Sequence, residues 1–387
     1  MKFCVIGPTY PYRGGLAHYT TFLVHHLRCK HEVVFYSYRR QYPRLIFPGN
    51  TAPDPSQRAL QEHCERTVDT INPLTWWQTA RAIVAQRPDV LILQWWTPFW
   101  LPLLLVIASA ARKASIPILY LCHQFIEPDS GMWEWHLARL ALRMSDALIV
   151  VSQREYALAS QAFPDKLIRL GHHPVYDGFP SQGLSREDAR RQLGIDEEVP
   201  LVLFFGFVRR YKGLRYLIEA LARVSSPVHL LVAGEFWEEE KDYHKLIRRY
   251  DLQERVTVHN RYIPNEEIEV YFTAADVLVL PYLSGSQSGV SMLAWHYGLP
   301  IIASNIGGLP ETIIQERTGL IVPPADVSAL AQAIDRFFHE GLCTPFRSGI
   351  IEMRNRFSWT ALVRIIEELS YKLVNNSTAL NPGHHAL

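Results

Sequence analysis

Short apolar runs alternate with helix-like segments along almost the whole chain, and this alternation restricts the fold more than any other feature. In the N-terminal half the predicted strands are residues 2–7, 32–38, 90–95, 117–123 and 147–152. The predicted helices between them are residues 16–27, 74–86, 101–113 and 132–144. A chain that alternates in this way favours a parallel sheet with helices on both faces.

The alternation starts again after a linker and a short polar helix at residues 175–199. The predicted strands are residues 201–208, 228–235, 256–260, 277–282, 300–304 and 319–322, and the predicted helices are residues 214–224, 239–250, 266–274, 290–297 and 327–338. The sequence therefore predicts two doubly wound, Rossmann-like domains, residues 1–180 and 198–356, that face each other across a cleft. A last helix at about 357–374, with Ser358 as its N-cap, is expected to pack back on the first domain, and residues 375–387 are predicted to be a frayed tail.

The composition is that of a globular protein, with 48% hydrophobic and 20% charged residues in 387. The net charge of +1 argues against a nucleic-acid partner. Residues 1–175 carry 18 Lys and Arg against 12 Asp and Glu, a surplus of +6, whereas the remainder sums to −5. The N-terminal half is therefore better suited to an anionic surface.

The sequence also favours a cytoplasmic location. Five scattered cysteines are typical of reduced, mostly buried thiols, and the first strand begins directly after Met1 with no signal peptide. The most apolar run, residues 100–111, is shorter than the about 20 residues that a membrane-spanning helix needs. No pairing of cysteine or histidine residues suggests a metal site.

One stretch combines a strand, a loop of small residues and a helix start. The apolar run Val277–Leu280 is followed by Pro281, then by the loop Ser284–Gly289, and a helical pattern begins at about Gly289. A strand, a Gly/Ser loop and a helix N-terminus form an arrangement that binds phosphate. Taken alone, the loop is equally consistent with a tight turn in an ordinary α/β domain.

Several short motifs, in this order, carry a resemblance to a known family. They are Gly14-Gly15-Leu16, the segment from Gly206 to Lys212-Gly213, Ala233-Gly234-Glu235, residues 260–264, and Gln287-Ser288-Gly289 leading to residues 307–311. Over nearly its whole length the chain resembles the retaining glycosyltransferases of family 4, which have the GT-B fold. The resemblance implies a nucleoside-diphosphate sugar donor, a UDP- or GDP-sugar, with neither a cofactor nor a catalytic metal.

The resemblance also implies a catalytic set of His123, Arg209 and Lys212. A diphosphate leaving group gains negative charge, so a lysine and an arginine in the loop before a helix suit its stabilisation. The family has its arginine directly after the glycine, where this chain has Phe207, and Arg209 or Arg210 would replace it. His123 stands where the family has a histidine that contacts the donor sugar.

The donor-binding residues that the resemblance implies lie in the same loops. They are Gly14, Gly15, Gly206, Glu235, Arg261, Tyr262, Gln287, Ser288, Gly289 and Val290. The family's paired glutamates are missing: Leu293 replaces the second, and the first falls near Gly285 or Ser286, with Gln287 the nearby polar substitute. We therefore expect front-face transfer with retention and no carboxylate nucleophile at that position.

The acceptor is predicted to be lipid-linked or a polysaccharide, in cell-envelope glycan synthesis. Arg39, Arg40 and Arg44, together with the aromatic run Trp95–Trp100, suggest docking at the inner face of an anionic membrane. In the alternative interpretation the tryptophans belong to the core and the arginines line the acceptor groove. Two other functions stay open: a non-catalytic nucleotide-sugar binding protein, and an epimerase that would use Glu127, Asp129 and Glu235.

Overall fold

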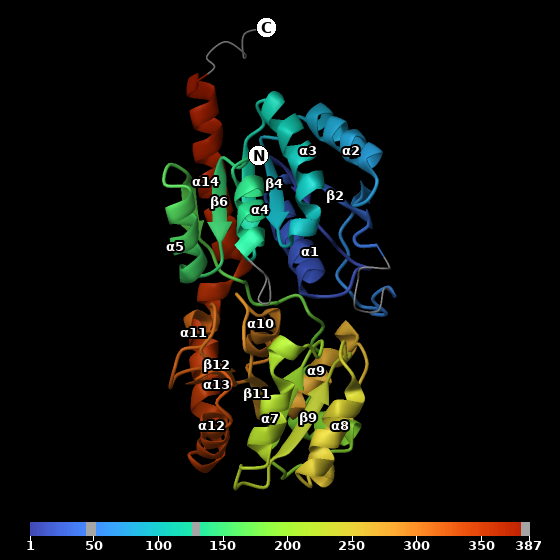
Figure 1. Cartoon of the computed structure of the whole chain (residues 1–387), viewed down its shortest axis with the longest axis vertical. Coiled ribbons are helices and arrows are strands. Elements are labelled where there is room, and N and C mark those ends of the chain that lie inside the picture. Colours follow the sequence, from blue (N-terminus) through green and yellow to red (C-terminus); the bar gives the residue numbers. More distant parts are fainter. Residues whose placement is uncertain (44–51, 126–131, 381–387) are drawn as a thin grey trace. The chain divides into compact units, whose positions relative to one another are not determined.

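The computed structural model describes residues 1–43, 52–125 and 132–380, with the backbone alone for residues 132 and 377–380. Arg44, Glu127 and Asp129 lie outside the described residues. The chain divides into two units (Figure 1). The N-terminal unit comprises residues 1–54, 60–174 and 358–387, and the C-terminal unit comprises residues 55–59 and 175–357.

The N-terminal unit is built on a seven-stranded parallel sheet with strand order β3-β2-β1-β4-β5-β6-β7. Its elements are β1 (Lys2–Ile6), α1 (Gly15–Arg28), β2 (Glu32–Arg40), β3 (Glu65–Asp69), α2 (Pro73–Gln86), β4 (Val90–Trp95), η1 (Pro98–Trp100), α3 (Leu101–Lys113), β5 (Ile118–Cys122), α4 (Met132–Leu142), β6 (Ala147–Val150), α5 (Gln153–Ala162), β7 (Leu167–Leu170) and α14 (Trp359–Leu380). The central strands are buried along their whole length, because helices cover both faces of the sheet.

The C-terminal unit has a six-stranded parallel sheet with strand order β10-β9-β8-β11-β12-β13. Its elements are α6 (Arg186–Leu193), β8 (Leu201–Phe205), η2 (Arg210–Lys212), α7 (Leu214–Leu221), β9 (His229–Ala233), α8 (Glu240–Arg249), η3 (Gln253–Arg255), β10 (Val256–His259), α9 (Asn265–Ala274), β11 (Val277–Leu280), α10 (Gly289–His296), β12 (Ile301–Ser304), α11 (Leu309–Thr312), β13 (Gly319–Val322), α12 (Val327–His339), α13 (Cys343–Met353) and η4 (Arg354–Phe357). Two doubly wound sheets in series confirm the predicted fold class.

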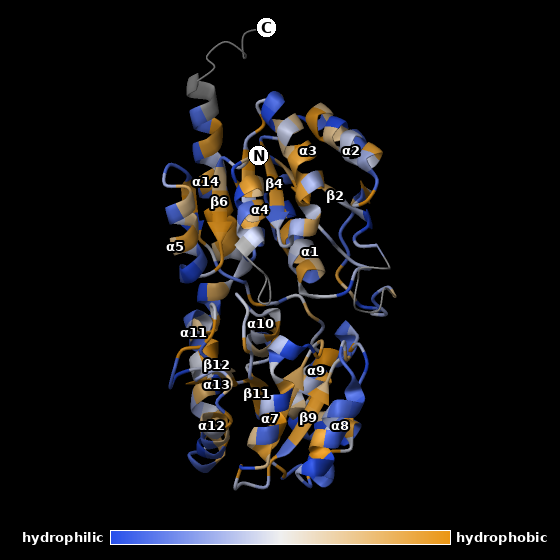
Figure 2. Cartoon of the chain, in the orientation of Figure 1, coloured by the Kyte–Doolittle hydropathy of each residue, from blue (hydrophilic) through white to orange (hydrophobic). Residues whose placement is uncertain are grey.

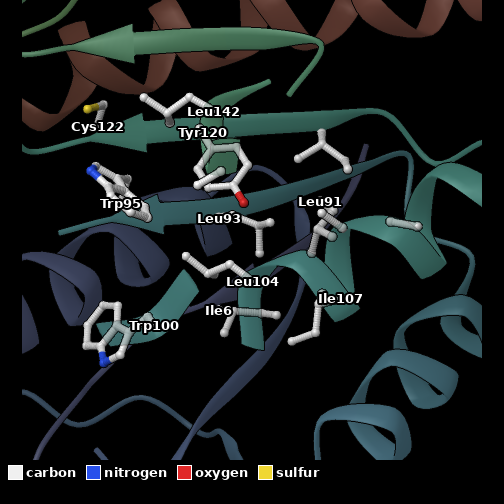
Figure 3. Packing of buried hydrophobic residues seen from close by; sticks show 14 of the residues in the cluster. Ile6, Leu91, Leu93, Trp95, Trp100, Leu104, Ile107, Tyr120, Cys122 and Leu142 are labelled. Atoms are coloured by element: carbon white, nitrogen blue, oxygen red, sulfur yellow. The ribbon is translucent and has the colours of Figure 1, made fainter. Parts of the chain in front are cut away.

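The aromatic residues predicted at the membrane are partly core residues. Trp95, at the end of β4, and Trp100, at the end of η1, are fully buried in the apolar cluster between the sheet and α3 (Figure 3). They cannot reach a lipid surface, so for these two tryptophans the alternative interpretation is the correct one. Arg40 forms an ion pair with Asp69 at 3.1 Å, and Arg39 is exposed.

Two further expectations need correction. The predicted tail is helical as far as Leu380, because α14 continues beyond residue 374. The cysteines are all free, but of the five only Cys4 and Cys122 are buried.

The N-cap at Ser358 is confirmed, since its Oγ accepts a hydrogen bond from the Ala361 amide at 3.2 Å. Within the described residues, no helix has the length and apolarity required to cross a bilayer.

Candidate functional site

The predicted donor-binding residues of the C-terminal unit gather at one edge of its sheet. Because all six strands are parallel, their carboxyl ends lie at the same edge, where ligands bind in folds of this type. Gly206 follows β8, Glu235 follows β9, Arg261 follows β10, and the loop 284–288 leads from β11 to α10.

Gly206, Lys212 and Val290 meet at this edge although they come from three separate segments. A Cβ atom built on Gly206 would lie 3.1 Å from Lys212 Nζ and 3.5 Å from Val290 Cγ2. Gly206 also has a φ of +98°, which side chains rarely adopt. The bare backbone of Gly206 thus faces the lysine ammonium and the first turn of α10.

Lys212 is held in place by the way η2 is anchored to the end of β11. Gly213 has a φ of +71°, and a Cβ atom there would lie 1.9 Å from the carbonyl oxygen of Pro281. The Leu283 amide donates a hydrogen bond to the Tyr211 carbonyl oxygen at 2.7 Å. The loop therefore packs backbone against backbone, which leaves little freedom to the lysine that it carries.

The Lys212 ammonium is buried, and its described neighbours include an aromatic ring and a second cation. Burial, and secondarily the Arg209 guanidinium, lower the pKa of the Lys212 ammonium to about 7. The Lys212 Nζ lies 5.7 Å from the centre of the Tyr282 ring, and among the described residues no carboxylate forms an ion pair with it. A buried ammonium group without a carboxylate partner is suited to an anionic ligand.

Arg209 lies in an aromatic cluster that the sequence analysis did not identify. Its guanidinium is 5.0 Å from the Tyr211 ring and 5.4 Å from the Trp237 ring. Trp237 Nε1 donates a hydrogen bond to Glu235 Oε1 at 3.1 Å, and the Phe207 ring packs 4.7 Å from Trp237. Aromatic residues at or just beyond the ends of predicted strands, such as Phe207 and Trp237, were the signal for this cluster. Arg210, the other candidate for the family's arginine, is exposed.

Arg261 and Tyr262 have different surroundings. Arg261 is exposed, pairs with Glu267 and donates a hydrogen bond to Tyr271 Oη at 3.2 Å. Its side chain is thus engaged on α9 in this structure. The Tyr262 ring lies 6.0 Å from Phe207, next to the aromatic cluster.

The loop 284–288 is fixed against the turn before α11. Gly307 has a φ of +52°, and a Cβ atom there would lie 2.0 Å from the Gly285 carbonyl oxygen. Gln287 Nε2 donates a hydrogen bond to the Gly308 carbonyl oxygen at 3.5 Å, so this amide is directed at the turn. Ser288 is buried, and its Oγ lies 3.3 Å from Tyr282 Oη.

The first turn of α10 begins with a glycine and contains no acidic residue. A Cβ atom built on Gly289 would lie 3.2 Å from Tyr176 Oη, so the ring of Tyr176 packs close to the helix start. Leu293, at the position of the family's second glutamate, is buried in the core. A buried leucine has no group that can hydrogen-bond a ribose hydroxyl.

Two family descriptions match this chain. "Glycosyltransferase Family 4" matches residues 13–179, and "Glycosyl transferases group 1" matches residues 185–361. The chain belongs to the family 4 glycosyltransferases. The two matches correspond to the two sheets.

Relatives of this glycosyltransferase support the assignment. This chain is 27% identical over 216 residues to a D-inositol 3-phosphate glycosyltransferase from Corynebacterium glutamicum. The match covers 53% of this chain and 51% of the relative. The chain is 23% identical to the putative teichuronic acid biosynthesis glycosyltransferase TuaC from Bacillus subtilis, over 62% of this chain and 59% of TuaC. The matched region of this glycosyltransferase thus spans about half the length of these curated relatives.

A solved structure confirms the GT-B fold. HepE from Anabaena, in complex with UDP, superposes with a TM-score of 0.75 at 18% identity, covering 96% of this chain and all of HepE (100%). Among the described residues, no group of three or more His, Cys, Asp or Glu side chains is arranged to hold a metal ion.

The glycosyltransferase's N-terminal unit holds the remaining predicted residues, Gly14, Gly15 and His123. Gly14 precedes α1 with a φ of +101°, Gly15 is the first helical residue and is exposed, and the first turn of α1 has no acidic residue. The amide end of this helix is therefore free of carboxylates from its own first turn.

His123 follows β5 and is part of a buried polar chain. Its Nε2 donates a hydrogen bond to Gln94 Oε1 at 3.0 Å, and Gln94 Nε2 donates to Thr20 Oγ1 at 2.8 Å. The ring lies edge-on to Tyr19, with 4.7 Å between centroids. Burial, and secondarily His173, lower the pKa of His123 to about 3, so the imidazole is neutral at physiological pH. Gln94, Thr20 and Tyr19 could not be predicted from the sequence, because β4 and α1 come together with the end of β5 only in the fold.

Proposed function

We propose that the enzyme transfers a sugar, with retention of configuration, from a UDP- or GDP-sugar to a lipid-linked or glycan acceptor in cell-envelope glycan synthesis. The observation that carries the donor class is Lys212: a buried ammonium group, without a carboxylate partner in the described part of the chain, that faces the backbone of Gly206. The structure of HepE with UDP supports a uridine nucleotide as the first choice.

The proposed chemistry places the charge that develops on the leaving diphosphate beside Lys212 and Arg209. Stabilisation of that charge lowers the barrier to breaking the glycosidic bond. A phosphate oxygen of the leaving group takes the acceptor proton on the same face, so the configuration is retained. This route needs no carboxylate nucleophile, in agreement with the buried Leu293. His123 is neutral and contributes hydrogen bonding, not charge.

The proposed acceptor and location depend on weaker support. Similarity to a putative teichuronic acid biosynthesis glycosyltransferase favours an envelope glycan acceptor. The +6 surplus of residues 1–175 favours work at the cytoplasmic, anionic side of a membrane as a peripheral protein. The chemistry proposed here uses neither a metal ion nor a cofactor.

Thermal shift with UDP-, GDP- and dTDP-sugars tests the donor, because a ligand that binds only the folded state raises its stability. Turnover of the best donor is then measured in Lys212→Ala, where we expect a loss of at least about tenfold, the scale of losing one group that stabilises the transition state. Arg215→Ala, which removes an exposed cation of α7, is the control and should keep wild-type turnover. Wild-type turnover in Lys212→Ala, or donor binding with no nucleotide release in the presence of lipid-linked and glycan acceptors, would contradict the proposal.

A further inference from the structure

Exposed large hydrophobic side chains are concentrated on one part of the N-terminal unit. Seven such side chains are exposed among the described residues, and five of them lie on α2, just before it, or on α4: Ile71, Leu74, Trp77, Trp133 and Leu140. Leu74 is 70% exposed, Trp77 53% and Trp133 60%. Single exposed hydrophobic residues are ordinary on a protein surface, but a group that includes two tryptophans marks an interaction site.

Helix α3 connects these side chains into one surface. It packs between α2 and α4 (Figure 1). Most of its outward residues before Arg112 are also apolar: Pro102 is exposed, and Leu105, Val106 and Ala110 are half-buried. Figure 2 shows hydrophobic residues along the ribbons of both α2 and α3. We name this area, formed by the outward residues of α2, α3 and α4, the α2–α3–α4 surface.

The charges of the α2–α3–α4 surface have a single sign. Its exposed cations are Arg81, Arg112, Lys113 and Arg139 on the helices, with Arg87 and Arg143 directly after α2 and α4. Within the described residues none of the six takes part in an ion pair. The only acidic residue of the three helices, Glu134, is buried. Cations at helix ends complement the helix dipole, but Arg81 lies inside α2. Asp89, which is exposed two residues after Arg87, accepts a hydrogen bond from the Lys2 amide and forms no ion pair with these cations in the described part of the chain.

We propose that the α2–α3–α4 surface docks on an anionic lipid bilayer. Tryptophans together with arginines and lysines are the residue types that collect at the membrane interface. A second copy of this chain is disfavoured, because a two-fold interface would place six unpaired cations against the same six. The proposal rests on the proposed function in one respect, the choice of a lipid-linked acceptor. The proposed membrane contact uses other residues than those predicted from the sequence, because Trp95 and Trp100 are buried.

Sedimentation with phosphatidylcholine vesicles, with and without phosphatidylglycerol, tests the proposal on the full chain. Wild-type protein should bind the vesicles that contain phosphatidylglycerol. The double variant Arg112→Gln/Lys113→Gln should bind them less tightly by about fivefold for each cation removed. Trp77→Ser should also lower the bound fraction. The matched control is Ile351→Ser, because Ile351 is 53% exposed, like Trp77, but lies on α13 of the C-terminal unit; it should bind like wild type.

Three outcomes would overturn the proposal. The first is that the wild-type protein binds both kinds of vesicle equally. The second is that the Trp77 and Arg112/Lys113 variants bind as tightly as the wild type. The third is a dimer that Trp77→Ser dissociates, which would assign the surface to a second copy. The thermal shift with nucleoside-diphosphate sugars, measured in the same variants, separates this test from that of the proposed function. A missing shift in the wild type would reject the donor class and leave the vesicle result standing.

Discussion

Lys212 gives the enzyme a pH dependence at the scale of a single residue. Its pKa of about 7 in the free enzyme means that the ammonium form is lost as the pH rises above 7. We expect the affinity for a nucleoside-diphosphate sugar to fall between pH 7 and pH 9, as calorimetry would measure it. Lys212→Arg keeps its charge over this range and should remove the dependence. The titration of His123, with its pKa of about 3, lies outside this window.

The stability of the free enzyme should change in the opposite direction. The unfolded chain keeps the proton of Lys212 up to about its ordinary pKa of 10.5, whereas the folded chain releases it near 7. Between these values the unfolded state binds more protons, so the free energy of unfolding attributable to Lys212 rises with pH, by at most about 1.4 kcal/mol per pH unit. Below pH 7 this contribution is constant. Urea unfolding at several pH values checks this, and an identical slope in Lys212→Met would contradict it.

At this scale the sequence predicted the groups of the site better than their surroundings. Gly206, Lys212 and Val290 were all predicted, and the structure brings them together. The aromatic rings next to Lys212 and Arg209, those of Tyr282 and Trp237, were not identified, because each is brought there by a different strand. Arg261 illustrates the reverse case: its motif predicts donor binding, but the structure shows it paired with Glu267, a contact that local sequence patterns do not reveal.

At the scale of the element, the loop between β8 and α7 must pack closely on β11 to position Lys212. Gly213→Ala would place a Cβ atom 1.9 Å from the Pro281 carbonyl oxygen, so η2 has to move. We expect turnover to fall by about tenfold or more, on the scale of misplacing a catalytic group. The control is Gly194→Ala, which has a similar φ of +66° but no neighbour within 4 Å. It should cost only the about 1–2 kcal/mol of the left-handed conformation and leave turnover unchanged. Equal turnover in the two variants would contradict this.

The strands that the sequence analysis predicted and missed differ in their place in the sheet. Central strands such as β4, with residues 90–95, were predicted at their observed bounds because burial on both faces requires a continuous apolar run. The two missed strands, β3 and β7, are the edges of the first sheet. Their sequences, ERTVD and LIRL, are short and partly polar, because an edge strand is partly open to solvent.

At the scale of the whole molecule, the chain passes between its units more often than sequence patterns reveal. Residues 55–59 belong to the C-terminal unit although they lie within the N-terminal half. Ser56 Oγ accepts a hydrogen bond from the Asn265 amide at 2.9 Å, and the Gln57 amide donates to Glu266 Oε1 at 3.1 Å. These contacts satisfy groups at the start of α9 from about 200 residues away in sequence, beyond the reach of any local capping pattern.

Two buried tryptophans offer a test of whether the units unfold separately. Trp359, at the start of α14, packs against Phe22 and His26 of α1 in the N-terminal unit. Trp295 of α10 packs edge-on to Phe357 in the C-terminal unit. Each substitution by alanine should cost about 3–5 kcal/mol, because it removes a large side chain from a closed core.

Hydrogen exchange followed by mass spectrometry would locate the loss. In Trp359→Ala, exchange should accelerate in β1, α1 and α14 and stay at the wild-type rate in β8–β13, whereas Trp295→Ala should show the reverse. Because a nucleoside-diphosphate sugar binds the C-terminal unit in our proposal, it should slow exchange in the Trp295 variant more than in the Trp359 variant. If both variants accelerated exchange equally in both sheets, the two units would unfold as one cooperative body. The division of the chain into two units would then describe its contacts but not its unfolding.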